Sequence, residues 1–320
     1  MPATTTTLAR FSTRDLPASE RAPFWREIFS REICHIDIEP QAGTAIEADA
    51  TMIVQPGLDV AWCNSFTPAC WKRTPEFVKD GDDSYALIMA VGGAMLRSQR
   101  GHDLPVERGD GVGILHAEPA SMRFNKLSHI ALMLPRAAIS AHVANLEDTV
   151  SRIVPRGNEA LWLLRRYVGN LRTSHRLTDP TLGKLVAAHV CDLVALALGA
   201  TRDAQHVALA RGVRAARLNA VKSDFAANPG LSLRALAERQ GVTPRYVQML
   251  FESEGTTFTS YALDRRLEYA RQMLAHPNFD AWSISAIAYA CGFGDLSHFN
   301  RTFKRHFGAT PSDMRSPKGR

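Results

Sequence analysis

Residues 283–311 read SISAIAYACGFGDLSHFNRTFKRHFGATP, and the first ten of them repeat an earlier stretch, SLRALAERQG at residues 232–241. The two copies lie 51 residues apart. Each copy begins with a serine that can cap the first turn of a helix, and each ends in a glycine suited to the left-handed turn after a helix. The repeat therefore predicts two short helices that each end in a tight turn. Identical residues in the two copies pair Ser232 with Ser283, Ala235 with Ala286, Ala237 with Ala288 and Gly241 with Gly292.

A second helix is predicted after each copy of the repeat. Residues 243–252 (TPRYVQMLFE) and 295–305 (DLSHFNRTFKR) both place apolar side chains on one helical face and polar side chains on the other. A helix, a glycine-containing turn and a polar-faced helix are typical of the helix-turn-helix motif, whose second helix enters the major groove of DNA. One such pattern is weak evidence, because helical hairpins are common. Two of them, joined by a helical stretch at 258–276, predict a C-terminal all-α domain with two helix-turn-helix motifs.

The positive charge of the chain gathers in the same region. At roughly 150 residues per domain, the 320 residues suggest about two domains. Residues 211–320 hold 16 lysines and arginines against 9 aspartates and glutamates, whereas residues 1–210 hold 22 against 23. A small basic domain beside a nearly neutral larger one indicates a polyanion as partner, which for this motif is double-stranded DNA.

The N-terminal part has a different pattern. Short runs of β type alternate with clusters of Gly, Pro and Asp, which is typical of a sandwich or barrel. Gly92-Gly93 and Gly109-Asp110-Gly111 are interpreted as turns between strands. After Pro135 the period becomes helical. The chain is therefore predicted to be an α+β multidomain protein, with an N-terminal β-sandwich or barrel that carries a helical appendage. The predicted strands are 46–54, 58–64, 85–91, 94–99, 111–115, 121–124 and 129–134, and the predicted helices of the appendage are 159–172 and 181–200.

Two stretches of the chain resemble a known family. GVTPRYVQMLFESEG at 241–255 and the second repeat follow the pattern of the DNA-binding domain of AraC/XylS-type transcriptional regulators, over about 217–317. More loosely, WREIFS, WKRTPEF and residues 101–135 resemble the AraC-binding-like sensory domain found in one branch of that family. The second resemblance implies a cupin-like barrel, a small-molecule effector and dimerisation helices. The more specific matches are Ile287-Ala288, Cys291-Gly292-Phe293, Ser297-His298-Phe299, Arg301, Phe303-Lys304, Phe307-Gly308 and Thr310-Pro311.

The resemblance divides the chain into three parts and assigns residues to DNA. Residues 1–205 become a sensory, effector-binding and dimerisation domain, 206–216 a linker, and 217–320 the double helix-turn-helix domain. Arginine pairs well with guanine edges and Gln or Asn with adenine, whereas Ser, His and Lys suit phosphate oxygens. Met249 departs from the family pattern, since many relatives carry arginine there, and it predicts either that the first helix reads fewer bases or that it makes an apolar contact with a thymine methyl. The implied contacts are Thr243, Arg245, Gln248 and Met249 in the first motif, and Leu296, Ser297, His298, Asn300, Arg301 and Lys304 in the second.

The sensory part has few signs of catalysis. Metal-dependent cupins carry a His-x-His pair, but His102, His116 and His129 are isolated and are interpreted as core or surface residues. The five cysteines lack CxxC spacing, so no metal site and no cofactor are predicted. Trp62, Trp71, Arg73, Tyr85 and Arg97 are candidates for a pocket, with aromatic rings for shape and arginine for a carboxylate; core aromatics and surface arginines explain them equally well.

Helix 181–200 is a candidate dimer interface. Its leucines fall on a narrow stripe with near-heptad spacing, suited to a partner helix, and His189 interrupts that stripe. In the alternative, the stripe packs on residues 161–168 of the same subunit, and His189 then needs a hydrogen-bond partner such as Asp192. The leucines of this stripe are Leu182, Leu185, Leu193 and Leu196.

These observations favour a cytoplasmic, homodimeric, DNA-binding transcriptional regulator, an activator that responds to an unidentified small-molecule effector, with RNA polymerase as a candidate further partner. No secretory signal opens the chain, and the apolar stretch 185–200 is too short for a membrane span, so no membrane partner is predicted. An enzyme is not predicted. The alternatives are a cupin-type enzyme fused to a DNA-binding module, and a repressor or architectural DNA-binding protein that responds to no ligand.

Overall fold

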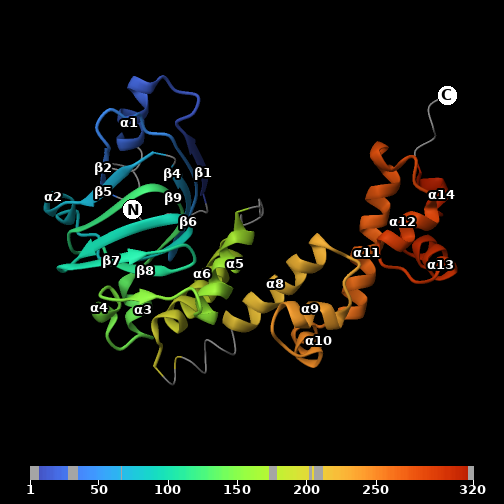
Figure 1. Cartoon of the computed structure of the whole chain (residues 1–320). Helices are drawn as coiled ribbons and strands as arrows, with labels where there is room; N and C mark the ends of the chain where they lie inside the picture. The colour runs from blue at the N-terminus through green and yellow to red at the C-terminus, as the bar shows by residue number, and fades with distance from the viewer. Residues whose placement is uncertain are drawn as a thin grey trace. The chain divides into compact units, whose positions relative to one another are not determined.

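A computed structural model describes residues 7–27, 35–65, 67–172, 179–201, 204 and 212–315. The chain separates into two compact units, Met1–Ala216 and Arg217–Arg320. The first unit contains a large antiparallel sheet and a group of helices, and the second unit is wholly helical (Figure 1). Residues 206–211 of the predicted linker lie outside the described residues.

One ten-stranded antiparallel sheet forms the first unit, in the order β1-β3-β4-β9-β6-β8-β10. β2 pairs with β5, β5 pairs with β9, and β7 pairs with β6. The two long strands, β6 and β9, pair with each other and each continues into a second set of partners, so the sheet curls around an interior (Figure 1). The strands are β1 (Thr7–Ser12), β2 (Asp37–Pro40), β3 (Ala48–Gln55), β4 (Leu58–Ser65), β5 (Ala69–Arg73), β6 (Tyr85–Gln99), β7 (His102–Val106), β8 (Gly111–Leu115), β9 (Ala120–Leu134) and β10 (Ile153–Val154).

Gly92-Gly93 does not separate two strands, and that prediction is wrong. Both glycines lie inside β6, at irregularities of its pairing with β9 between Ala90 and Gly92 and between Gly93 and Met95. Gly93 has a φ of 77°, which a bulge can use to bend a strand without ending it. Because the bulge does not end the strand, the predicted strands 85–91 and 94–99 form one strand, β6. The predicted strands 121–124 and 129–134 also form one strand, β9, which pairs with β6 along its length.

The two faces of the sheet bury different cores. In β6, Leu87 and Met89 belong to the core beneath the helices, whereas Ala86 and Ile88 belong to the core inside the curled sheet. This division follows the alternation of side chains along a strand. Helix α1 (Ala18–Arg26) adds Trp25 to the interior core. The other helices of this unit are α2 (Pro75–Val78), α3 (Arg136–Ser140), α4 (Leu146–Thr149), α5 (Glu159–Leu171) and α6 (Pro180–Leu198).

Helix α6 only partly follows the predicted stripe. Leu193 is 0% exposed and packs in the core beneath the helices, as the alternative of packing within one subunit predicts. Leu182 and Leu185 near the start of the helix are exposed. His189 has a hydrogen-bond partner within its own subunit, as that alternative requires, because the hydroxyl of Tyr167 on α5 lies 3.0 Å from the ring Nδ1. Among the described residues, Thr181–Leu198 is the one stretch apolar and long enough to cross a membrane, and 67% of it is buried inside the protein.

The second unit consists of two small helical bundles that share one helix. Phe258 and Ala262 of α11 pack in the first bundle, and Leu267 and Met273 of the same helix pack in the second. Each bundle contains one copy of the sequence repeat. The elements are α8 (Arg214–Ala227), α9 (Leu233–Arg239), α10 (Pro244–Glu252), α11 (Phe258–Ala275), the 3-10 turn η3 (Pro277–Phe279), α12 (Ile284–Ala290), α13 (Leu296–Phe307) and α14 (Pro311–Met314).

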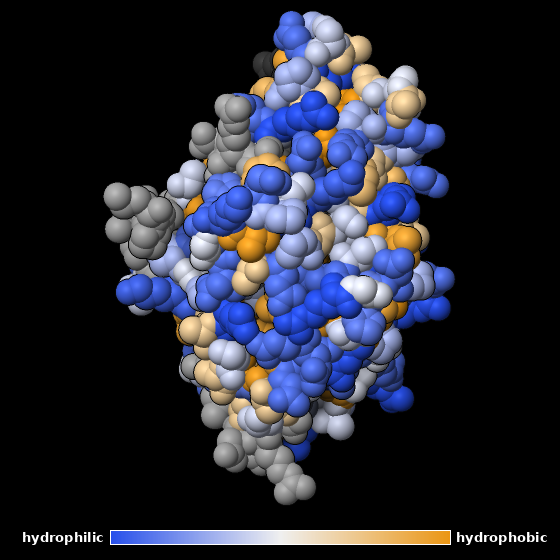
Figure 2. Space-filling view, turned by 90° about the vertical axis from the view of Figure 1, so that its left-hand side faces the viewer, coloured by the Kyte–Doolittle hydropathy of each residue, from blue (hydrophilic) through white to orange (hydrophobic). Residues whose placement is uncertain are grey.

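The local signals of the repeat act as predicted. The Ser232 hydroxyl accepts a hydrogen bond from the Ala235 amide at 3.1 Å, and Ser283 accepts the equivalent bond from Ala286 at 3.0 Å. A sheet-rich N-terminal unit followed by a helical unit with two helix-turn-helix motifs confirms the predicted fold class. On the face shown in Figure 2, hydrophobic residues lie scattered among hydrophilic ones, as expected when most apolar side chains are inside the cores.

Candidate DNA-binding surface and effector cavity

Helix α10 presents polar side chains opposite its buried face. Val247, Leu250 and Phe251 are buried in the first bundle. Arg245 and Gln248 are exposed, as is Met249, which is 42% exposed although apolar. Thr243 stands at the helix start, where its hydroxyl oxygen accepts a hydrogen bond from the Tyr246 amide at 3.2 Å. That bond uses one lone pair, so the hydroxyl hydrogen remains free to donate to an acceptor such as a phosphate oxygen.

Helix α13 repeats this arrangement in the second bundle. Phe299, Thr302 and Phe303 face the core. The exposed residues Ser297, His298, Asn300, Arg301 and Lys304 lie on the opposite side, and four of them have the i, i+3, i+4, i+7 spacing of a single helical face.

Leu296 differs from the other predicted contacts on α13. Its side chain is half-buried and packs against the core of the second bundle. Nine of the ten predicted residues therefore lie exposed on the two second helices or at the start of one, and Leu296 lies at the edge of a core.

The predicted arginines carry uncompensated charge. Within the described parts of the chain, neither Arg245 nor Arg301 forms an ion pair with a carboxylate. The last turn of α13 adds Lys304, Arg305 and His306. Two exposed guanidinium groups on equivalent helices are suited to hydrogen bonds with guanine edges or phosphate oxygens.

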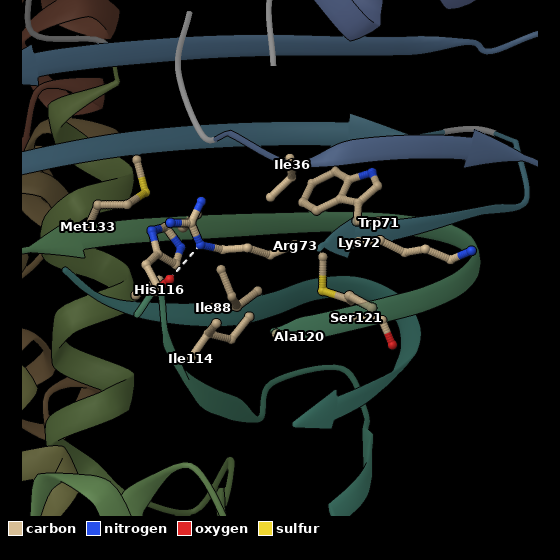
Figure 3. A pocket seen from close by; sticks show the side chains of 13 residues that line it. Ile36, Trp71, Lys72, Arg73, Ile88, Ile114, His116, Ala120, Ser121 and Met133 are labelled. Atoms are coloured by element: carbon tan, nitrogen blue, oxygen red, sulfur yellow. Dashed lines mark hydrogen bonds between the residues drawn. The ribbon is translucent and has the colours of Figure 1, made fainter. Parts of the chain in front are cut away.

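The interior of the curled sheet contains a cavity (Figure 3). The centre of a water-sized sphere can reach about 60 Å³ of it, and the cavity opens to solvent on one side. Most of its wall is apolar. The lining residues are Ile36, Trp71, Lys72, Arg73, Ala86, Ile88, Ile114, His116, Ala120, Ser121, Met122, Ala131 and Met133.

Arg73 lies at one end of this cavity, and each nitrogen of its guanidinium group donates a hydrogen bond. Its Nε donates to the His116 carbonyl at 2.5 Å, and its two terminal nitrogens donate to the His35 carbonyl at 3.0 Å and to Asp80 at 2.9 Å (Figure 3 draws the first of these bonds). Burial acts to raise the pKa of Asp80, but the hydrogen bond from Arg73 helps to outweigh it, so the pKa lies below its ordinary value. Arg73 and Asp80 therefore form a compensated ion pair.

His116 is paired in the same way. Its Nδ1 lies 2.9 Å from a carboxylate oxygen of Asp82 and 3.0 Å from the hydroxyl of Ser84. Burial would raise the pKa of Asp82, yet hydrogen bonds from His116 and Ser84 hold that pKa below its ordinary value. Asp82 is thus the partner of His116 at this end of the cavity.

The five predicted pocket residues divide between the two faces of the sheet. Trp71 and Arg73 line the cavity. Trp62 and Tyr85 belong to the core beneath the helices, where the Tyr85 hydroxyl lies 3.0 Å from that of Thr149. Arg97 donates a hydrogen bond to the Val150 carbonyl and is 0% exposed, so the interpretation as a surface arginine is wrong for this residue. Arg73 is buried as well, so it is not a surface arginine either.

Several residues of the cavity wall were not predicted. Ala86 and Ile88 in β6, and Ala131 and Met133 in β9, stand two positions apart and therefore point to the same face. That alternation is visible in the sequence, but the sequence does not tell which face encloses the space.

His129 is a core histidine, as interpreted from the sequence. It is 2% exposed, and its ring centroid lies 4.9 Å from that of Trp71. Neither ring nitrogen has a hydrogen-bond partner among the described residues. Burial lowers the pKa of His129 to about 3. His102 is exposed and His116 is buried. Within the described ranges, no three His, Cys, Asp or Glu side chains lie close enough to hold a metal ion.

His129 should make the first unit sensitive to acid. Because its folded pKa lies below the ordinary value, the unfolded chain takes up a proton below about pH 6.5 that the folded protein excludes. Between pH 7.5 and pH 5 the wild type should therefore lose about 2 kcal/mol more unfolding free energy than His129→Leu does. Urea unfolding at both pH values measures this. His102→Leu should keep the wild-type loss, and an equal loss in His129→Leu would contradict the assignment.

Comparison with known proteins agrees with both units. Residues 236–316 match a family described as helix-turn-helix domain, and residues 25–199 match one described as AraC-binding-like domain. The transcriptional activator RhrA of Rhizobium meliloti (strain 1021) is 38% identical over 158 residues, which are 48% of this chain and 48% of RhrA. This chain thus spans about half the length of that relative.

Two further relatives match almost end to end. The transcriptional activator NphR of Rhodococcus sp is 23% identical over 321 residues, covering 96% of this chain and 92% of NphR. The crystal structure of the AraC-like transcriptional activator CuxR covers 89% of this chain and 99% of its own, with a TM-score of 0.52 and 17% identity, a likeness of fold. The AraC-binding-like domain covers more than half of this chain and a helix-turn-helix domain follows it, so this chain belongs to the AraC family of transcriptional regulators.

Proposed function

We propose that this chain is a transcriptional activator that binds promoter DNA through its second unit and responds to a small-molecule effector held in its first. The observation that carries the proposal is the pair of equivalent helices, α10 and α13, each with one face in a core and an exposed polar face. The similarity to RhrA and NphR, both named as transcriptional activators, supports the direction of regulation.

In this proposal the exposed face of each second helix contacts DNA. Arg245 and Arg301 read bases, since a guanidinium group can donate two hydrogen bonds to one guanine. Lys304 contacts the phosphate backbone. The remaining contacts are Thr243, Gln248, Met249, Ser297, His298 and Asn300, with Leu296 supporting α13 from the edge of its core.

Single substitutions of these residues should separate base reading from backbone contact. Arg245→Ala and Arg301→Ala should each weaken binding by about 1–3 kcal/mol, or about 5- to 150-fold, and relax specificity at one position. Lys304→Ala should weaken all sequences alike and reduce the slope of log affinity against log salt by about one. The measurement is fluorescence anisotropy of the full-length protein on a site selected from random duplexes.

Arg234 provides the matched control. It lies on α9, the first helix of its motif, where it is exposed and paired with Glu238. Arg234→Ala should keep wild-type affinity and specificity. Wild-type affinity in both Arg245→Ala and Arg301→Ala would overturn the proposed surface, and specificity lost in Lys304→Ala alone would reverse the roles of arginine and lysine.

The rest of the proposal concerns how the units work together. Residues 1–205 bind the effector without turning it over and form a homodimer through the exposed leucines Leu182 and Leu185 of α6. Residues 206–216 connect them to the DNA-binding residues 217–320. The effector then shifts an equilibrium between two placements of the DNA-binding units, which is a coupling between distant sites. The protein acts in the cytoplasm, with RNA polymerase as its partner at the promoter.

A further inference from the structure

The cavity inside the curled sheet has features that restrict its ligand. Its wall consists mainly of an indole ring and aliphatic or thioether side chains, among them Trp71, Ile88, Ile114 and Met122. The space lies where β6 and β9 carry alanines, Ala86, Ala120 and Ala131. Burial of apolar ligand surface against such a wall is favourable in proportion to the area removed from water.

The charged groups of the wall are already compensated. Arg73 is paired with Asp80, and Lys72 with Glu39. Figure 3 shows the amino group of Lys72 directed away from the end where Arg73 and His116 meet. The positive charge of Arg73 and of Lys72 is thus already neutralised, and a carboxylate ligand would bring a second negative charge near Asp80.

The wall offers few groups for hydrogen bonds. Arg73 already donates to two backbone carbonyls and Asp80, and the Nδ1 of His116 is bonded to Ser84 and Asp82. This leaves two N–H groups of Arg73, the Nε2 of His116 and the Ser121 hydroxyl for a ligand. A ligand with many hydroxyl groups would leave most of them without a partner. Each buried hydroxyl left unpaired weakens binding by about 1–3 kcal/mol, equivalent to about 5- to 150-fold.

We propose that this cavity binds an uncharged, largely apolar molecule, and neither a sugar nor a carboxylate. This inference rests on the proposed function, because it names the chemical class of the effector. The space left by Ala86, Ala120 and Ala131 receives the apolar part of the ligand, and the compensated groups at Arg73 and His116 close one end of the site without holding an anion.

Matched ring compounds test this class directly. Benzyl alcohol should bind the full-length protein at least about tenfold more tightly than benzoate, and cyclohexanol at least about tenfold more tightly than myo-inositol. Isothermal titration at pH 7.5 gives the affinities. Tighter binding of benzoate than of benzyl alcohol, or of myo-inositol than of cyclohexanol, would overturn the proposal.

Substitutions that fill the cavity test whether the ligand binds there. Ala131→Leu should weaken benzyl alcohol binding at least about tenfold, because the added atoms occupy the space of the ring. Ala120→Leu, at a half-buried position of the same wall, should do the same if Ala131→Leu fails to fold by circular dichroism. Ala94→Leu, at an exposed position of β6, should bind like the wild type. Unchanged affinity in a folded cavity variant would overturn the site.

Measuring DNA binding beside ligand binding shows whether this inference or the proposed function has failed. If the wild type binds its selected duplex but no ring compound, the ligand class is wrong and the DNA-binding function remains. If Arg245→Ala and Arg301→Ala bind that duplex like the wild type while benzyl alcohol binds as expected, the DNA-binding proposal is wrong and the ligand class stands.

Discussion

Leu193→Asp should unfold the first unit. The side chain is fully buried, in a core that also contains Val190 and Val194 of the same helix together with residues of α5 and the sheet. Truncation of a core leucine alone removes about 2–5 kcal/mol of unfolding free energy, and a buried carboxylate without a partner adds a further desolvation cost. The expected loss of more than about 5 kcal/mol is comparable with the whole stability of many domains. Circular dichroism should show the β signal lost at 25 °C.

Leu185→Asp is the matched control on the same helix. Leu185 is 47% exposed, so the charged side chain can remain in water and the unit should stay folded. Sedimentation of this variant tests the proposed dimer, because the charge would disrupt a contact made through Leu185. A folded monomer supports the interface, whereas a dimer as stable as the wild type would reject it. A folded Leu193→Asp protein would contradict the packing of α6.

Gly93→Ala should destabilise the first unit by about 2–5 kcal/mol. Gly93 has a φ of 77°, which costs roughly 1–2 kcal/mol for alanine. A Cβ atom there would overlap the Lys126 carbonyl oxygen, a backbone atom held by the pairing of β6 with β9. Relief of such a clash typically costs a further 1–3 kcal/mol or more, about as much as overpacking in a core. Urea unfolding measures the change.

Gly101→Ala isolates the backbone contribution. Gly101 has a similar φ of 74°, but no atom of the described residues lies within 4 Å of the position that a Cβ atom would take there. Its substitution should cost only about 1–2 kcal/mol. If both variants lose the same amount, the bulge in β6 is looser than the structure indicates, and the close approach to Lys126 does not limit the residue at this position.

The helical unit could be predicted from the sequence because its signals are local. Ser232 and Ser283 each cap a helix by accepting a hydrogen bond from the amide three residues later in the chain. The periodicity of apolar residues in α10 and α13 shows which face of each helix is buried. The exposure of Arg245 and Arg301 follows from the same period. That these side chains contact DNA remains a prediction, since it depends on a partner molecule as well as on the fold.

The sheet of the first unit was predictable only in outline. Alternating short runs indicated many strands, but Gly92-Gly93 can make either a turn or a bulge, and the choice depends on a partner strand more than 30 residues away. The same limit applies to α6, whose leucine stripe suits a partner helix or its own subunit equally well. Leu193 is buried because α6 packs on α5 and α3 in one core with a face of the sheet, and that packing has no sequence signature.

The sequence by itself determined the two-part organisation, the helix-turn-helix repeat and the polar faces of its second helices, because caps, turns and periodicity act within a few residues. Tertiary structure alone decided which face of each strand encloses the cavity, that Trp71 and Arg73 reach it while Tyr85 and Arg97 do not, and that Asp80 compensates Arg73. These outcomes depend on the pairing and curl of strands distant in sequence, since only that pairing determines which side chains meet and which charges are neutralised.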